Sequence, residues 1–174
     1  MIGTEAGGES APSFEREVRV YTDGASTGSR GPGGYGAVIL FRQGRTVEIS
    51  GGEHDTTNLR MEITAACAAL ETIDEGHTVT VYSDASYLVN CMRRGWYEKW
   101  GENDWLNHRK RPVANRDLWE RLLTATERHR EVRWRKVKGH SRKAGAHKSG
   151  NDRADELAVT AKKQVEITPA SGGN

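Results

Sequence analysis

The stretch TNLRMEITAACAALETIDEGHTVTVYSDAS, residues 57–86, decides the fold class. Its first part repeats apolar side chains at the spacing of one helix face, which predicts a helix over 57–75. Its second part, 78–83, alternates apolar and polar residues as a strand does, and it ends at Asp84. A helix that runs into such a strand indicates an α/β protein. The apolar helix positions are Leu59, Ile63, Ala66, Leu70 and Ile73.

The flanking segments extend this alternation of strands and helices. Because helical crossovers link strands 17–23, 78–83 and 131–137, we expect these three to be parallel in a mixed sheet. We interpret 17–164 as one domain, with flexible tails at 1–16 and 165–174. The other predicted elements are a strand hairpin at 35–42 and 45–51, a tryptophan-rich helical region at 85–106, and helices at 115–129 and 151–164.

Composition excludes a membrane span and a disulfide-rich secreted protein. Of the 174 residues, 35% are hydrophobic and 29% charged, and no apolar run approaches the ~18 residues of a membrane helix. The first residues hold no apolar stretch typical of a signal peptide, so we expect a cytoplasmic protein, and a monomer. Cys67 and Cys91 fall inside apolar helical patterns and are predicted to be reduced and buried.

Charge is concentrated in one segment. Residues 128–148 hold nine Lys or Arg and one Glu, a net charge of +8, while the other 17 basic and 23 acidic residues give −6. A basic stripe on an acidic body favours a localised contact with a polyanion. The alternative is a solvated strand edge and loop.

Four acidic residues have recognisable settings: Asp23 in YTDGAS, Glu62 in NLRMEIT, Asp84 in VYSDAS and Asp155 in NDRADELA. Asp23 and Asp84 end strand patterns, where open α/β sheets build their sites. Glu62 lies about 60° from the centre of the apolar helix stripe, so it flanks the buried face. If the four carboxylates converge, they repel unless cations separate them, and Mg²⁺ or Mn²⁺ suits oxygen ligands. We therefore predict a metal-dependent phosphodiester hydrolase.

Each of these residues also has a purely structural interpretation. Asp23 could be a turn residue, because Asp-Gly is common in turns, and Glu62 could be a helix-surface carboxylate. Asp84 could cap the helix that follows it. Asp152 competes with Asp155, but we assign Asp152 to capping the last helix, where a negative charge suits the helix dipole.

Several segments together resemble type 1 ribonuclease H, in that family's order and over roughly residues 17–162. They are YTDGAS with GPGGYGAV, TTNLRMEITAA, VYSDASYLV, RRGW with RPVANRDLWERL, WRKVKGHS and GNDRADELA. The resemblance implies a five-stranded mixed sheet flanked by helices and cleavage of the RNA strand of RNA–DNA hybrids. It also implies two divalent ions, Mg²⁺ or alternatively Mn²⁺, held by the four carboxylates, and 5′-phosphate and 3′-hydroxyl products. His140 resembles the family's loop histidine, which assists the metals or product departure. His147, in the same loop, is the alternative candidate for this role.

The resemblance further implies substrate contacts. Thr57 matches a phosphate-pocket threonine and Asn58 an asparagine that contacts the minor groove, while Ser26 and Ser86 occupy positions that face sugars. Both Thr57 and Asn58 also offer oxygens that could cap the helix start. The region 93–111 corresponds to a protruding substrate handle. There Trp96 would pack on a deoxyribose, the other tryptophans would pack the helix, and phosphates would meet Arg109, Lys110 and Arg111.

Three rival interpretations remain open at this point. A transposase or integrase core could use Asp23, Asp84 and Glu120, but it leaves Glu62 and the last helix unexplained. A hybrid-binding protein without catalysis, or a catalytically weak one, would not need all four carboxylates. A ribonuclease H domain detached from a reverse transcriptase would share the same chemistry.

Overall fold

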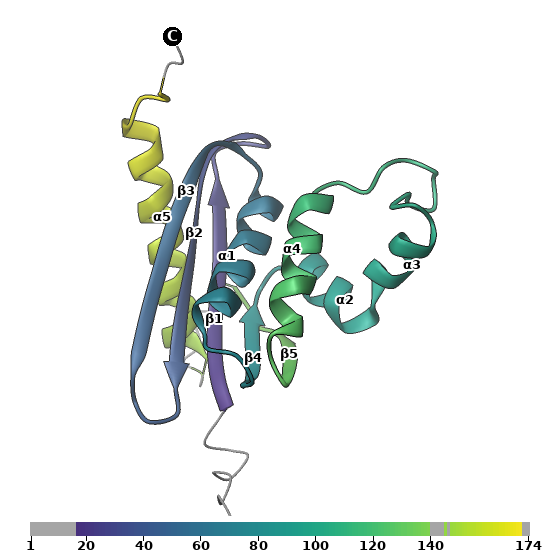
Figure 1. Cartoon of the computed structure of the whole chain (residues 1–174). Coiled ribbons are helices and arrows are strands. Elements are labelled where there is room, and N and C mark those ends of the chain that lie inside the picture. The colour runs from purple at the N-terminus through teal and green to yellow at the C-terminus, as the bar shows by residue number, and fades with distance from the viewer. Residues whose placement is uncertain (1–16, 140–144, 146, 172–174) are drawn as a thin grey trace, which may run out of the picture.

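The computed structural model describes residues 17–139, 145 and 147–171. Within these residues, five strands and five helices form in an order that matches the alternation of the sequence patterns (Figure 1). The strands are β1 (Glu17–Ser26), β2 (Gly31–Phe41), β3 (Thr46–Thr56), β4 (Thr78–Ser83) and β5 (Glu131–Lys136). The helices are α1 (Asn58–Thr72), α2 (Ser86–Arg94), α3 (Trp96–Glu102), α4 (Arg116–Glu127) and α5 (Lys148–Ile167).

The strands form one mixed sheet in the order β3-β2-β1-β4-β5. The first three strands are antiparallel neighbours, whereas β1, β4 and β5 run parallel. This confirms the parallel arrangement expected from the helical crossovers, and it confirms the five-stranded mixed sheet. The register places Tyr21 of β1 beside Tyr82 of β4, so both strands finish at the same edge of the sheet.

Helices cover the two faces of the sheet unequally. In Figure 1, α1 and α4 lie on one face and α5 lies on the other, while α2 and α3 project to the side. The main core lies under α1 and α4 and includes fully buried Ile63, Leu70 and Trp119. On the opposite face α5 approaches β2 closely, because a Cβ atom on Gly34 would lie 2.4 Å from a carbonyl oxygen of α5. The glycine-rich start of β2 thus allows α5 to lie directly on the strand.

Several boundaries differ from those expected. Strands β1 and β2 extend into the segment predicted as a glycine-rich turn, because this part of β2 must pair with β1 under α5. The region 85–106 is two helices instead of one, interrupted at Gly95, which has a left-handed φ of 65°. The last helix is longer than predicted at both ends, spanning Lys148–Ile167.

Both cysteines are buried and unpaired, as predicted from their apolar surroundings. Burial raises the pKa of each thiol, Cys67 and Cys91, to about 12. Thiols with such a pKa are poor nucleophiles and poor metal ligands. Among the helices of the described residues, none combines the length and the hydropathy that crossing a bilayer would require.

Candidate metal centre

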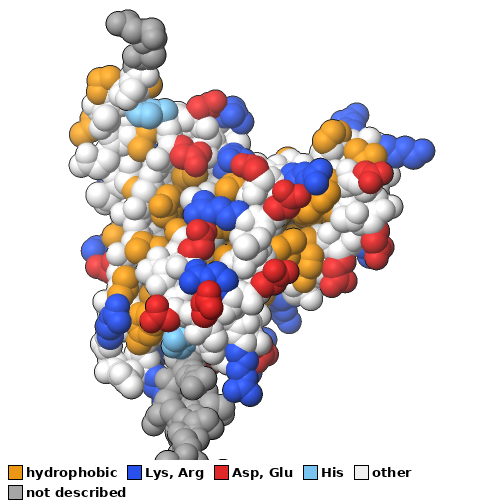
Figure 2. All heavy atoms as spheres, viewed as in Figure 1, with side chains coloured by type: hydrophobic (Ala, Val, Ile, Leu, Met, Phe, Trp, Pro, Cys, Tyr) orange, Lys and Arg blue, Asp and Glu red, His pale blue; other side chains and the backbone are white. Residues whose placement is uncertain are grey.

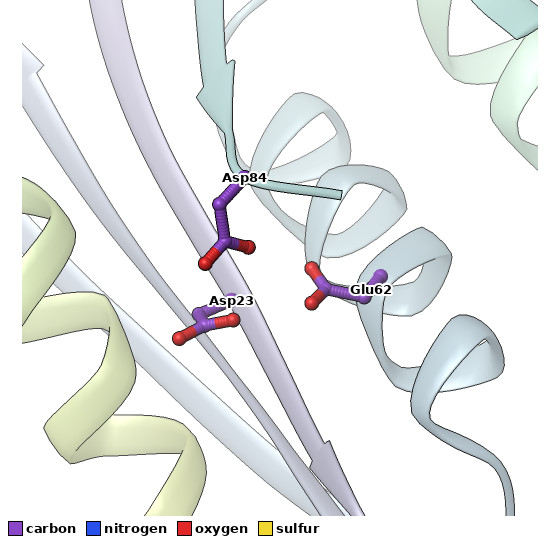
Figure 3. Close-up of side chains that lie close together, drawn as sticks. All are labelled: Asp23, Glu62 and Asp84. Carbon is purple, nitrogen blue, oxygen red and sulfur yellow. The ribbon is translucent and has the colours of Figure 1, made fainter. Parts of the chain in front are cut away.

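Three of the four predicted carboxylates converge at one edge of the sheet. Asp23 lies in β1, Asp84 follows β4 directly, and Glu62 projects toward both from α1 (Figure 3). One carboxylate oxygen from each residue lies within 4.8 Å of the others. Because β1 and β4 are adjacent and parallel, Asp23 within β1 and Asp84 just after β4 come together from positions far apart in the sequence. Asp23 is therefore not a turn residue: its strand continues to Ser26.

Glu62 reaches this cluster because α1 packs tightly against β1. Thr57 caps the helix: its side-chain oxygen accepts the Arg60 backbone N–H at 3.2 Å. One strand residue beyond Asp23, a Cβ atom on Gly24 would lie 2.5 Å from the backbone nitrogen of Glu62. Only glycine permits this approach. The result is a glutamate only 4% exposed, which excludes the interpretation of Glu62 as a surface carboxylate.

The cluster is electrostatically unfavourable without a cation. Burial, and then the charge of Asp84, raise the pKa of Asp23 to about 7, although the Gly24 backbone N–H donates to its Oδ1 at 2.9 Å. Burial also raises the pKa of Glu62 well above its usual value, and Asp23 adds to this effect. Among the described residues, Oε2 of Glu62 has no hydrogen-bond partner. A hard divalent cation would satisfy this oxygen and remove the repulsion, so these residues fit Mg²⁺ or Mn²⁺.

Asp155 stands beside this cluster without belonging to the compact group of three. It lies on α5, is partly exposed, and helps to raise the pKa of Asp23 through a side-chain hydrogen bond. Asp23 therefore interacts both with Glu62 and Asp84 and with Asp155.

One capping assignment, that of Asp152, is wrong, and the alternative that Asp84 is a cap is excluded. Asp152 does not cap α5, which begins earlier than predicted; instead its Oδ2 pairs with Lys148 Nζ at 2.6 Å. Asp84 does not cap α2, because Ala85 occupies the cap position. The transposase-like set also fails, because Glu120 lies exposed on α4, where it pairs with Arg116 at 2.8 Å.

Two histidines, His140 and His147, are candidates for a role at the site. His140 lies outside the described residues. Its neighbour Gly139 is packed against the Asp84 carboxylate so closely that a side chain there would collide with it. His147 immediately precedes α5, and its Nδ1 is hydrogen bonded to the Tyr21 hydroxyl at 2.7 Å. His147 is therefore occupied in packing contacts next to β1.

The predicted substrate residues near the cluster lie at the ends of the same elements. Thr57 precedes α1 and is partly buried, and Asn58, its first residue, is exposed. Ser26 ends β1, where its hydroxyl donates to the Gly28 carbonyl at 3.3 Å. Ser86 is the first residue of α2, two positions after Asp84. All four thus lie close in sequence to the cluster carboxylates or to the helix that carries one of them.

The predicted handle consists of α3 and the loop that follows it. It projects from the body in Figure 1, and in Figure 2 a notch separates it from the rest of the molecule. Trp96 is half-buried, so part of its ring is accessible. It contacts Tyr87 edge-on, with the two ring centroids 5.3 Å apart. Trp100 contacts Trp105 and Trp119, as expected for tryptophans that pack the handle onto α4. The basic residues of the handle, Arg109, Lys110 and Arg111, are exposed.

Sequence patterns did not single out Arg60, which links the start of α1 to the base of the handle. Its guanidinium donates to Asn115 at 3.1 Å and makes two hydrogen bonds to Asp117. The only local signal was a charged side chain between two apolar ones. This network fixes Thr57 and Asn58 relative to α4.

Comparisons with known proteins agree with this geometry. A family model described as RNase H matches residues 15–163. A ribonuclease H of Moorella thermoacetica is 51% identical over 84% of this chain and 91% of its own length. The corresponding values for a ribonuclease H of Chlorobium phaeovibrioides are 50%, 83% and 94%.

Solved structures give the same result. The crystal structure of LC9-RNase H1, described as a type 1 RNase H with the type 2 active-site motif, superposes with a TM-score of 0.70 at 30% identity. That alignment covers 86% of this chain and 73% of LC9-RNase H1. With the family model, the relatives and the acidic cluster in agreement, the chain belongs to the ribonuclease H family, as a type 1 member, and is an RNA–DNA hybrid endoribonuclease.

Proposed function

We propose that this enzyme hydrolyses the RNA strand by two-metal-ion catalysis, with Asp23, Glu62, Asp84 and Asp155 as the ligands, and leaves 5′-phosphate and 3′-hydroxyl ends. The observation that carries the proposal is the group of three carboxylates within 4.8 Å, one of which has a buried oxygen with no hydrogen-bond partner among the described residues. Two divalent ions, when bound, lower the pKa of an attacking water and stabilise the departing 3′ oxygen. Mg²⁺ is the proposed ion, and Mn²⁺ is a substitute.

Each carboxylate has a role that follows from its position. Asp23 interacts with Glu62 and Asp84 and also with Asp155, so we assign it the role of sharing both cations. Glu62 is the most buried of the four and is held by its helix, so it keeps one cation next to the sheet. Asp155 is more open to solvent, which suits a ligand that must adapt as substrate enters and product leaves.

The substrate contacts are proposed from placement and chemistry. A hybrid binder must recognise 2′-hydroxyls on one strand and a DNA backbone on the other. Ser26, Asn58 and Ser86 offer short polar groups near the cluster, and Thr57 offers a hydroxyl for a phosphate. The partly exposed ring of Trp96 is a surface for a deoxyribose. Positive charge for phosphates comes from residues 109–111 of the handle and from the exposed residues 135, 136 and 138 of β5 and its loop.

His140 is proposed to exchange a proton with the reacting groups or to help product leave, because an imidazole titrates near neutrality. We also propose a cytoplasmic monomer. Among the described residues, the large hydrophobic side chains that are exposed are Tyr87 and Ile167, too few for an extensive subunit interface.

The test compares a defined RNA–DNA hybrid with double-stranded RNA and double-stranded DNA, each with Mg²⁺ and with excess chelator. We expect cleavage of the hybrid only, dependent on Mg²⁺, with products that accept a 3′ extension and carry a 5′-phosphate. Cleavage that persists in chelator, or cleavage of DNA strands, would overturn the proposal.

One matched pair of variants tests the ligand assignment on a single helix. Asp155→Asn should lower kcat by about a hundredfold or more, because metal ligation contributes several kcal/mol to the transition state. Asp152→Asn removes an equal charge one helical turn away, where the carboxylate pairs with Lys148, and should stay within about twofold of wild type. Equal losses in both variants would remove Asp155 from the site.

A further inference from the structure

Three aromatic rings from three distant segments stack beside the acidic cluster. Tyr21 of β1 and Tyr82 of β4 are register partners whose ring centroids lie 5.0 Å apart. The His147 ring stacks on Tyr82 with a centroid separation of 4.3 Å. Its Nδ1 and the Tyr21 hydroxyl are hydrogen bonded at 2.7 Å. We refer to Tyr21, Tyr82 and His147 as the ring stack.

The ring stack is tied to the carboxylates by strand geometry. Tyr21 lies two residues before Asp23, and Tyr82 lies two residues before Asp84. Successive side chains of a strand point to opposite faces, so Tyr21 and Asp23 point to the same face of β1. The face is the one covered by α5, because Tyr21 packs there with Ala154 in a small buried cluster.

The same rings hold the beginning of α5. His147 immediately precedes the helix and accepts the Asn151 backbone N–H through its carbonyl oxygen at 3.1 Å. The Gly150 backbone packs on the Tyr21 ring so closely that a Cβ atom would lie 2.4 Å from Cδ2. Ala154, which packs with Tyr21, is fully buried and immediately precedes Asp155. The first two turns of α5 therefore pack on the tyrosine rings as far as Ala154, and Asp155 is the next residue.

We propose that Tyr21, Tyr82 and His147 are positioning residues that set the distance of Asp155 from the other three carboxylates. The inference rests on the proposed function, because it assigns the ring stack an effect on cation binding. An α-helix is stiff over two turns, so a displacement at His147 moves Asp155 relative to Asp23. In this proposal the three rings act indirectly, through α5, and not on the reacting atoms.

The test removes the hydrogen bond while keeping the rings. Tyr21→Phe and His147→Phe each preserve an aromatic ring, and the double variant completes a mutant cycle. The matched control is Tyr35→Phe, which removes a hydroxyl from a half-buried tyrosine of β2 that lies against Gly51, away from α5. Three quantities are measured: the Mg²⁺ concentration for half-maximal cleavage, the KM for the hybrid, and hydrogen–deuterium exchange of amides 148–155 in metal-free protein.

We expect each single variant to raise the half-maximal Mg²⁺ concentration about fivefold, in keeping with the modest net contribution of one neutral hydrogen bond. The KM for the hybrid should stay within about twofold, since the proposal gives the ring stack no substrate contact. Exchange over 148–155 should accelerate. The double variant should be no worse than the single ones, because both lose the same bond. Saturating Mg²⁺ should restore the rate.

An unchanged Mg²⁺ dependence in both single variants would overturn the inference, as would an equal change in Tyr35→Phe or additive effects in the double variant. The outcome is separable from failure of the proposed function. If wild-type protein cleaves hybrid without any divalent cation, the two-metal proposal fails. If wild type depends on Mg²⁺ but the ring variants behave identically to it, only the positioning role fails.

Discussion

Replacing Asp84 with asparagine should stabilise the metal-free protein while abolishing cleavage. The nearest ligating oxygens of Asp84 and Asp23 lie within 4.8 Å, and the charge of Asp84 is the second cause, after burial, of the raised Asp23 pKa. At an effective dielectric constant of about 20, two unit charges at this distance repel by about 3 kcal/mol. The raised pKa of Glu62 favours its neutral form. The repulsion energy above therefore includes only the charges of Asp84 and Asp23. Because Asp84 is partly exposed, solvent screening lowers the expected gain to about 2 kcal/mol.

The sign of the pH dependence follows from the Asp23 pKa of about 7, which is above the 3.8 of an ordinary aspartate. Folding disfavours the ionised form, so metal-free wild type loses stability as pH rises from about 4 through about 7. The gain in Asp84→Asn should therefore be largest at pH 8 and should shrink toward zero at pH 5, where Asp23 is protonated in the folded protein.

Thermal unfolding in chelator measures this gain. We expect the variant to melt roughly 4–8 °C above wild type at pH 8, which corresponds to about 2 kcal/mol for a chain of this size. Adding Mg²⁺ should stabilise wild type more than the variant, because a ligand stabilises the state that binds it. Asp152→Asn serves as the control and should show no gain, since it removes a carboxylate that is paired with Lys148. If Asp84→Asn melts at the wild-type temperature at pH 8, or gains equally at pH 5, then the carboxylates do not repel one another and the electrostatic argument is wrong.

Three other predictions concern the same site and the handle. The half-maximal Mg²⁺ concentration should fall as pH rises from 6 to 8, because Asp23, with a pKa of about 7, must lose its proton before it binds a cation; a flat profile in cleavage titrations would contradict this. Gly24→Ala should push α1 away from β1, cost about 2 kcal/mol or more in urea unfolding, and weaken cleavage by moving Glu62; wild-type stability would show that the contact is not tight. Reversing the three basic residues 109–111 to Glu should raise the KM for hybrid, most strongly at low salt; a salt-independent KM equal to that of wild type would place the handle off the substrate path.

The tryptophan-rich region was predicted correctly in its packing but not in its division into two helices. Their spacing indicated helix packing, and the mutual contacts of Trp100, Trp105 and Trp119 agree with it. The break at Gly95 was not predicted, because the helical periodicity continues across it and only the left-handed conformation of that residue ends α2.

For the last helix, the sequence pattern predicted the wrong starting residue. Asp152 was assigned to a cap because the predicted helix began at 151, whereas α5 begins at Lys148. The residues 147–150 carry no strong helix-start signal. Their helical conformation follows from packing on Tyr21, a residue more than a hundred positions away.

The sequence by itself determined the α/β class, the parallel set of strands, and the four carboxylates with their flanking motifs. These properties are local: side-chain periodicity defines a strand or helix, and a short motif marks the residue at its end. Only the tertiary structure decided that Glu62 is buried, that three carboxylates approach within 4.8 Å, and that Asp155 stands slightly apart on a helix seated on two tyrosines. Burial and repulsion between charges depend on groups that meet only when distant strands pair, so no segment of the chain carries that information alone.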